Sequence, residues 1–544
     1  MTKGTNSPRS PQSRLEVATP ELSAGFPLHD FLAGIEELTH HERARIVQQA
    51  IMLLESLHVN LPLKCAMYAV DPLRRLRLLQ QRLPSVFSTD WAFHREMTQI
   101  FNSLNDLHTN YFLPEPFSSH TAWLPFAIEF CNDGNHPAYL ATKVRRKFFS
   151  DRAFRKGVEI LAWNGVPIDQ AVALFGAQSP SGAGNPAARH ALGLQTLTLR
   201  PLSILLPPDE DWVIVGYRSP QRGRKREIRV PWRVSSNAKT GMDSARDSLT
   251  RHVQKLRRLL FARGGTDEPE ARKVNTPSGT FGYLRIFTFD VPDAGQFIED
   301  IIAKITKLPQ DGLIVDVRSN AGGKTAAAER LLQLFAPDHP QIRIEPARLC
   351  LINTPRMLQF CKLQASNAEL AFQGLKPWIE SVARAMETGA PYSASFPITD
   401  PDSCNAKGRL YPGPVIVITD GMSRSAAEVF AAGFQDHGGK ILGVDKSTAG
   451  AGASVRRQSQ FKDYFKDAKE SPFINLPKSI DFSIPFRRFQ RVRRHIGSEI
   501  EDFGVVSNYL HTMTRNDVLN RNVDLINKAA SILSKDFGAH KRRV

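Results

Sequence analysis

The 544-residue chain lacks the features that would tie it to a membrane, a metal or an oxidising compartment. No window approaches about 18 uninterrupted apolar residues, the length that a membrane-spanning helix needs. The first residues, MTKGTNSPRSPQSRLEVATPELSAGF, contain no apolar segment of the kind found in secretory signal peptides. The five cysteines are odd in number and form no zinc-type or closely paired spacing. We therefore expect free thiols, no metal, no cofactor and a cytoplasmic location, with secretion or a periplasmic location left open.

The chain also lacks a concentrated nucleic-acid-binding motif, although its formal net charge is +17. The basic residues are scattered, with local runs over residues 222–229 and 486–494. No aromatic platform accompanies them, so we expect no nucleic-acid partner. The run over residues 486–494 is typical of a solvated edge strand.

A hydrophobic content of 42% over this length is enough for two to four domains. Residues 1–30 are rich in Ser, Pro and Thr, which predicts a disordered amino terminus. Residues 31–118 form a predicted helical domain. It begins with the capping box THHE at Thr39 and includes the apolar periodicity of DPLRRLRLLQQRL and DWAFHREMTQIFNSL.

Residues 119–275 change to short alternating strands with Gly and Pro turns. Within them, residues 154–176 combine the alternating VEILAW, the turn Asn164-Gly165 and a following helix. This order resembles the middle of a PDZ module. Strand-turn-helix segments occur in many folds, so this segment is not specific to PDZ modules.

Residues 276–535 again alternate strands and helices, interrupted by a predicted insertion at about 336–411 and followed by a basic tail, 536–544. The sequence therefore predicts an α+β multidomain protein. Its parts are an amino-terminal helical domain, a β-rich PDZ-like module and a domain of repeated strand and helix units.

Ser425 stands between a predicted buried strand, PVIVIT, and a predicted helix, AAEVFAAGFQDHGG. Backbone amides at a helix amino terminus are unpaired and carry partial positive charge. An oxyanion formed beside Ser425 would thus be stabilised by the amide of Ala426. The same position suits a serine that only caps the helix, and this segment alone leaves both interpretations open.

Four sequence segments, taken in their order along the chain, favour Ser425 as a nucleophile over Ser425 as a helix cap. GYLRIFTF, GLIVDVRSNAGG, SRSAAEVFAAGFQDHGG and EDFGV resemble, one after another, the catalytic domain of the tail-specific or C-terminal-processing serine proteases. The resemblance implies a crotonase/Clp-like spiral of ββα units and makes Ser425 the expected nucleophile.

Well-known members of this family use a Ser-Lys dyad, but Ala451 stands where that lysine belongs. Lys440 and Lys446 lie before the turn in question and remain alternatives for the base. A branch of the family that includes the tricorn protease and the chlamydial protease-like activity factor instead uses a histidine and a late glutamate. By that resemblance, His108 in LNDLHTNY is the expected base and Glu501 in IEDFGV the expected orienting acid. The acids that compete with Glu501 are Glu499, Asp502 and Asp436.

The resemblance also places the second oxyanion donor in RSNAGG, at Gly322, with Gly323 as the neighbour that permits the turn. The chain departs from the family at GVVSN, where a G-V-x-P-D pattern is usual.

The expected function is a serine endopeptidase that hydrolyses peptide bonds through an acyl-enzyme with a Ser-His-Glu triad. Its expected partner is a peptide or unfolded protein, and a homo-oligomer is left open. One alternative is a catalytically silent peptide- or ligand-binding protein on the same fold, which would have little need for the complete chemical set. A crotonase-type acyl-CoA enzyme fits less well, because the PDZ-like and helical parts suit peptide handling.

Overall fold

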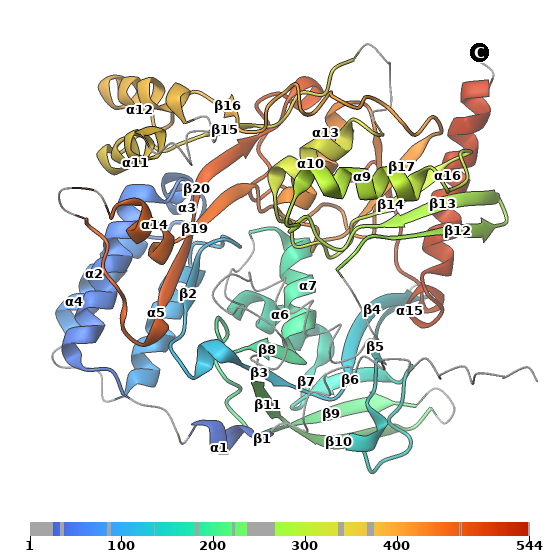
Figure 1. Cartoon of the computed structure of the whole chain (residues 1–544). Helices are drawn as coiled ribbons and strands as arrows, with labels where there is room; N and C mark the ends of the chain where they lie inside the picture. Colours follow the sequence, from blue (N-terminus) through green and yellow to red (C-terminus); the bar gives the residue numbers. More distant parts are fainter. Residues whose placement is uncertain are drawn as a thin grey trace, which may run out of the picture.

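The computed structural model describes residues 26–32, 37–83, 89–134, 136–179, 184–219, 223–236, 267–335, 342–366, 375–466, 468 and 471–541. Figure 1 shows an amino-terminal group of helices, a β-rich region coloured cyan to green, and a mixed layer formed by the later part of the chain. Among the described residues, no helix is both long and apolar enough to cross a bilayer.

The amino-terminal region is helical, as its apolar periodicity predicts. The predicted capping box is formed: the Glu42 amide donates to the Thr39 hydroxyl at 3.3 Å, and the Glu42 carboxylate accepts from the Thr39 amide at 2.8 Å. The short helix α3 was not predicted. The helices are α1 Leu28–Leu32, α2 His40–Leu57, α3 Leu61–Tyr68, α4 Pro72–Arg82 and α5 Asp90–Asn102.

The predicted disorder over residues 1–30 does not extend to its last five residues. Strand β1 (Phe26–Pro27) pairs with β11, and α1 follows it with Leu28 buried. Residues 1–25 lie outside the described residues. At the other end, α16 continues to Lys541 and so includes most of the predicted basic tail.

The β-rich region contains two sheets, with strand orders β1-β11-β3-β8 and β10-β9-β6-β5-β4. Asn164 (φ 48°) and Gly165 (φ 80°) are both left-handed, as a two-residue hairpin turn between β6 and β7 requires. The elements are β3 His120–Trp123, β4 Ala127–Asp133, β5 His136–Thr142, β6 Glu159–Trp163, β7 Val166–Pro167, α6 Ile168–Gln178, α7 Pro186–Thr196, β8 Leu199–Pro201, β9 Trp212–Arg218, β10 Lys225–Pro231 and β11 Arg233–Ser236.

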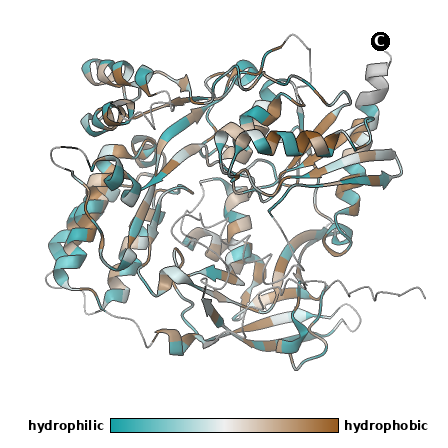
Figure 2. Cartoon of the chain, in the orientation of Figure 1, coloured by the Kyte–Doolittle hydropathy of each residue, from teal (hydrophilic) through white to brown (hydrophobic). Residues whose placement is uncertain are grey.

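The later part of the chain is built on a six-stranded sheet of order β12-β13-β14-β17-β18-β21, parallel from β13 to β21. Alternate residues of its strands enter two cores. Val315 and Val417 pack with α9, α10 and α13, whereas Ile314 and Ile416 pack with α16. Figure 2 shows hydrophobic residues along these elements. They are β12 Glu270–Thr276, β13 Gly279–Arg285, α9 Ala294–Ile305, β14 Leu313–Asp316, α10 Thr325–Leu332, β17 Val415–Thr419, α13 Ala426–Asp436, β18 Lys440–Gly443, β21 Tyr509–Leu510, α15 Arg515–Leu519 and α16 Val523–Lys541.

A second sheet joins the two ends of the chain. Strand β2 (Asn110–Phe112) pairs antiparallel with β20 (Asp481–Gln490), and Asn110 lies opposite Ser483 across 373 residues of sequence. This pairing places the loop that precedes β2 next to the later domain. The remaining elements are β15 Arg348–Cys350, α11 Pro355–Ser366, α12 Lys376–Thr388, β16 Phe396–Pro397, β19 Ala453–Arg457 and α14 Gln458–Tyr464.

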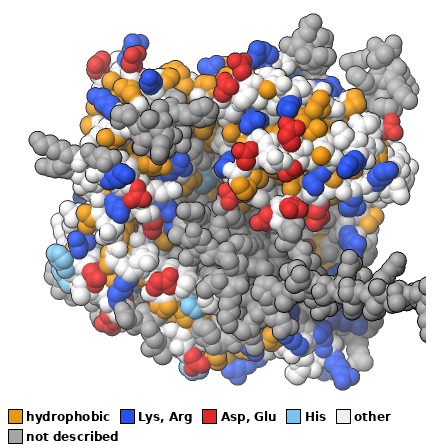
Figure 3. Space-filling model, viewed as in Figure 1, with side chains coloured by type: hydrophobic (Ala, Val, Ile, Leu, Met, Phe, Trp, Pro, Cys, Tyr) orange, Lys and Arg blue, Asp and Glu red, His pale blue; other side chains and the backbone are white. Residues whose placement is uncertain are grey.

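Strand β20 corrects the expectation of a solvated edge strand. It has partners on both sides, β19 on one and β2 and β15 on the other, and all of its residues but Gln490 are buried. Arg487 tolerates burial because its guanidinium lies over the rings of Trp378 and Phe486, at 5.8 and 4.8 Å. On the face drawn in Figure 3, Lys and Arg are interspersed with Asp and Glu, the mixture expected of a solvated surface.

Candidate active site

Ser425 occupies a sharp turn between strand β17 and helix α13. Its backbone has φ 54° and ψ −124°, whereas an ordinary capping residue has extended, negative-φ geometry. Ser425 is half-buried, while its neighbours Arg424 and Ala426 are each only 1% exposed. A strained non-glycine residue at a helix amino terminus is more typical of a reactive site than of a cap.

The glycine turn after β14 packs directly against this serine. A Cβ atom on Gly322 (φ 93°) would lie 2.7 Å from the Cβ of Ser425 and 2.9 Å from the Ala426 nitrogen. A Cβ on Gly323 (φ 141°) would lie 2.0 Å from the Asp290 nitrogen. Both positions therefore require glycine.

The Gly322 amide already has an acceptor. It donates to the side-chain oxygen Oδ1 of Asn320 at 2.9 Å, and the Gly322 carbonyl accepts from the Phe289 amide at 2.9 Å. An oxyanion that bound the Gly322 amide would have to replace Asn320 as its acceptor.

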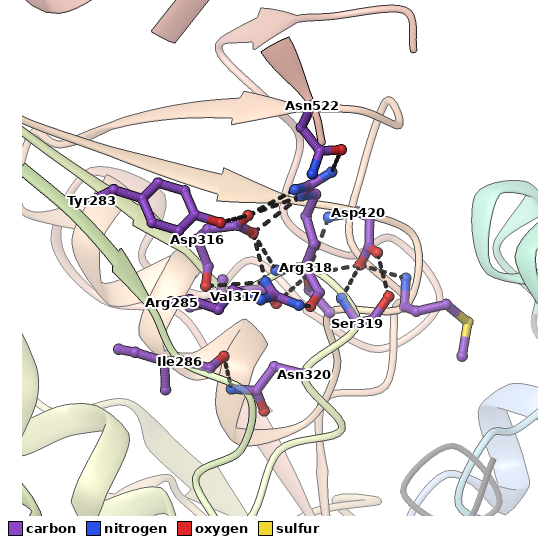
Figure 4. A network of polar contacts seen from close by, with 12 residues as sticks. Tyr283, Arg285, Ile286, Asp316, Val317, Arg318, Ser319, Asn320, Asp420 and Asn522 are labelled. Atoms are coloured by element: carbon purple, nitrogen blue, oxygen red, sulfur yellow. Dashed lines mark hydrogen bonds and ion pairs between the residues drawn. The ribbon is translucent and has the colours of Figure 1, made fainter. Parts of the chain in front are cut away.

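A buried carboxylate holds this turn in place, as Figure 4 shows. Asp316, at the end of β14, accepts from the Tyr283 hydroxyl at 2.7 Å and pairs with Arg285 at 2.6 Å and Arg318 at 2.8 Å. Despite burial, the two guanidinium groups hold the pKa of Asp316 well below its usual range. The Asp316 carboxylate, paired with both guanidinium groups, therefore anchors the start of RSNAGG.

A second contact ties the two turns together. The Asp420 carboxylate, just after β17, accepts from the Ser319 amide at 2.7 Å and from the Met422 amide at 3.0 Å. The segments that carry Gly322 and Ser425 are thus linked through Asp420 as well as through direct packing.

Glu428, one helical turn after Ser425, is fully buried and accepts four hydrogen bonds. One is from the Ser425 amide at 3.1 Å. The others are from the Thr448 hydroxyl at 2.6 Å, the Gly450 amide at 2.7 Å and the Ala451 amide at 2.8 Å. Burial raises the pKa of Glu428 to about 7, against the effect of these donors. This carboxyl joins the nucleophile turn to the loop 447–452.

The loop 447–452 carries no lysine toward the site. Ala451, which stands at the dyad lysine position, is buried and donates to Glu428. Lys440 and Lys446 are both exposed. The loop instead holds the segment that contains Glu501: the Asp502 amide donates to the Gly450 carbonyl at 2.9 Å.

His108 lies between α5 and β2 and is buried, at 6% exposure. Its amide donates to Asp106 Oδ1 at 2.8 Å, and its carbonyl accepts from the Ser483 hydroxyl at 2.8 Å. Burial lowers the pKa of His108 to about 4, with Asp106 opposing and the Arg424 guanidinium adding to the effect. Arg424 directly precedes Ser425, so a charge from the nucleophile turn acts on this imidazole.

Glu501 is also buried, and its Oε1 forms an ion pair with the Lys64 Nζ at 2.8 Å. Burial raises the pKa of this carboxyl well above its usual range, and Lys64 opposes the rise. Within the described part of the chain, Oε2 of Glu501 and Nδ1 of His108 are buried without a hydrogen-bond partner. The structure thus places the Glu501 carboxylate beside Lys64 and the His108 backbone beside Asp106, and among the described residues no hydrogen bond joins the two side chains.

The competing acids have partners of their own. Glu499 pairs with Arg488 at 2.7 Å, and Asp436 pairs with Arg491 at 2.5 Å and with His495 at 2.7 Å. Asp502 pairs with Lys64 at 2.6 Å and accepts from the Tyr68 hydroxyl at 2.8 Å.

Sequence reasoning missed three further buried groups. Asp106, at 1% exposure, accepts from the His108 amide and from Asn60 Nδ2 at 3.2 Å. His58 contacts the Thr109 hydroxyl at 2.7 Å, and Lys64 belongs to the unpredicted helix α3. Of these three, only Asp106 could have been found from the sequence, because it stands two residues before His108.

Comparison with known proteins agrees with this architecture. Residues 280–466 match peptidase family S41, and residues 120–239 match a PDZ domain. The structure of mature CPAF complexed with lactacystin has a TM-score of 0.65 and 19% identity, and covers 91% of this chain and 99% of that chain. Another structure of mature CPAF has a TM-score of 0.66 and 18% identity, and covers 91% and 98%. The photosystem II D1 C-terminal processing protease has a TM-score of 0.40 and 12% identity, and covers 91% and 98%.

Proposed function

We propose that the chain is a serine peptidase and that Ser425, His108 and Glu501 are its nucleophile, base and orienting acid, a proposal that the match of residues 280–466 to peptidase family S41 supports. The observation that carries the proposal is the geometry of Ser425. A strained serine at the start of α13 lies against Gly322 so closely that a Cβ there would be 2.7 Å from its own Cβ. This arrangement places Ser425 beside the backbone amide of Ala426 and the Gly322 turn.

In the proposed reaction, the Ser425 hydroxyl attacks the carbonyl carbon of a peptide bond and gives its proton to His108. With a pKa of about 4, the imidazole is neutral and able to accept that proton throughout the neutral pH range. His108 then donates the proton to the leaving amine, and water hydrolyses the acyl-enzyme by the reverse sequence.

The oxyanion of each tetrahedral intermediate is proposed to bind between the Ala426 amide and the Gly322–Gly323 turn. Loss of one such donor typically lowers turnover by about 10²- to 10³-fold. Glu501 would accept the second imidazole N–H of His108, fix its tautomer and stabilise the imidazolium. The PDZ domain would hold an extended stretch of the substrate by strand addition.

Covalent capture tests the proposal. Folded protein treated with a fluorophosphonate probe should gain one adduct on Ser425, and Ser425→Ala protein should gain none. Peptide mapping by mass spectrometry locates the adduct. An unlabelled wild-type protein, under conditions where a control serine hydrolase labels fully, would overturn the assignment of the nucleophile.

A further inference from the structure

Lys64 is a fully buried lysine far in sequence from every residue of the proposed triad. Its ammonium contacts Glu501 Oε1 at 2.8 Å, Asp502 Oδ1 at 2.6 Å and the Asn105 carbonyl at 3.2 Å. These three acceptors match the three donors of an ammonium group. Lys64 therefore connects helix α3 of the amino-terminal region to the late acidic loop.

The surroundings of Lys64 explain why it stays charged. Desolvation alone would lower its pKa, but the nearby carboxylates reverse this and raise the pKa above its usual range. A protonated lysine whose ammonium is held by two carboxylates and a backbone carbonyl is unsuited to act as the base for Ser425. The charged and titratable groups that act on Lys64, Glu501 and His108 come from α3, the loop after α2, the loop before β2, the turn before α13 and the late loop: Tyr68, His58, Asp106, Arg424 and Asp502.

The surroundings of Glu501, in contrast, disfavour its charged form. Burial raises its pKa well above the usual range, and the negative charges of Asp106 and Asp502 act in the same direction. A protonated Glu501 would offer the imidazolium no charge. Lys64 is the cation that opposes this rise.

The contacts leave one oxygen of Glu501 available. Lys64 binds Oε1, while Oε2 and the Nδ1 atom of His108 are both buried without a hydrogen-bond partner among the described residues. Buried polar atoms without partners are costly, and a hydrogen bond between Oε2 and the Nδ1–H of His108 would satisfy both.

Building on the proposed triad, we propose that Lys64 is a positioning residue. Its ammonium favours the ionised form of Glu501 and holds Oε1, which leaves Oε2 for the Nδ1–H of His108. Lys64 touches neither substrate nor Ser425 in this role, and acts through the carboxylate.

The test is the pH dependence of kcat/KM for the full-length chain, measured from pH 4 to pH 9 with dye-labelled unfolded casein. Lys64→Met should lower kcat/KM at pH 7 by about 10- to 100-fold, the usual effect of losing a supporting contact. Because Glu501 would then require a higher pH to ionise, the acid limb should move at least one pH unit toward alkaline pH. A purely structural role would lower activity at every pH and leave the limb in place.

Asp502→Asn changes the shape of the side chain little and should shift the acid limb in the direction opposite to that of Lys64→Met. Removing the Asp502 charge lowers the pKa of Glu501, so the acid limb should move toward acid pH. Lys64→Arg keeps the positive charge and should keep the wild-type limb even where kcat falls. Tyr68→Phe removes a hydrogen bond to Asp502 from the same helix without changing any charge, and should leave the limb unmoved.

The outcomes separate this proposal from the triad. If Ser425→Ala still cleaves casein, the triad itself is wrong. If Ser425→Ala and Glu501→Gln are inactive but Lys64→Met and Asp502→Asn both retain the wild-type limb, only the role of Lys64 is overturned. Should Lys64→Met fail to fold by circular dichroism, the direction of the Asp502→Asn shift decides.

Discussion

Gly322 and Ser425 are in such close contact that a methyl group on the glycine would lie 2.7 Å from the Cβ of the serine. These residues follow two adjacent parallel strands, β14 and β17, whose carboxyl ends meet at one edge of the sheet. The contact is thus a product of sheet topology, and it can be tested directly.

Gly322→Ala should lower kcat by about 10²-fold or more, because displacement of a nucleophile by about 1 Å has an effect of that size. The rate of fluorophosphonate labelling of Ser425 measures the effect. Gly134→Ala is a matched control, since Gly134 also has a positive φ (65°) but open space around its Cβ position. It should lose some stability and no activity. Equal labelling rates in the two variants would contradict the proposed packing role.

Exchange of buried histidines should separate the base from its neighbours. His108→Ala should be as inactive as Ser425→Ala, because members of a triad act as one unit. His58→Gln is the control: His58 is equally buried and also has a pKa of about 4, but it contacts Thr109. It should retain Ser425 labelling.

Lys440 and Lys446 are the alternatives to His108 as the base for Ser425. Lys440→Ala and Lys446→Ala should retain activity, since both lysines are exposed. An active His108→Ala together with an inactive Lys440→Ala or Lys446→Ala would move the assignment to a dyad. Steady-state cleavage of labelled casein distinguishes the two patterns.

Glu428→Gln should damage the nucleophile turn without changing its volume. Each oxygen of Glu428 accepts from a backbone amide, so an amide NH₂ at either position would face a backbone N–H. An unsatisfied buried donor costs about 1–3 kcal/mol. We expect a lower melting temperature and slower labelling of Ser425.

Glu329→Gln is the control for Glu428. Glu329 is also buried, and burial raises its pKa to about 7 as well, but its Oε1 accepts from the Ala347 amide at 2.8 Å, an acceptor that glutamine retains. It should label at the wild-type rate. Loss of labelling in this variant would mean that such substitutions act through general destabilisation.

Local sequence signals predicted most of what lies close together in the chain. The capping box at Thr39, the turn at Asn164 and the strand-turn-helix around Ser425 depend on neighbouring residues, and all three are present. The helical segment after Thr514 is divided into α15 and α16, because Arg521 and Asn522 are left-handed.

Long-range pairing was beyond such signals. Residues 486–490 of the basic run that was expected at a sheet edge lie in β20, where β15 and β19 pair with the strand and all but Gln490 are buried. Helix α3 has weak periodicity, and Lys64 looks like any surface lysine until the late acidic loop packs against it. Burial and partner charges, which decide the state of Glu501, exist only in the fold.

The fall in activity at acid pH, the acid limb of the pH profile, depends on the protonation of His108 and Glu501. Catalysis by the proposed triad needs a neutral His108, whose pKa is about 4, and an ionised Glu501, whose pKa is raised above 4.5. As pH rises, His108 loses its proton first, so the limb should report Glu501.

Glu501→Gln should lower turnover by as much as ~10⁴-fold with little change in melting temperature. Its residual activity should lose the limb and decline only near the pKa of His108. Glu499→Gln, which removes a partner of Arg488 alone, should keep both activity and limb. A Glu501→Gln variant with the wild-type profile would show that another acid orients the imidazole, and Asp106, which already binds the His108 amide, would be the next to test.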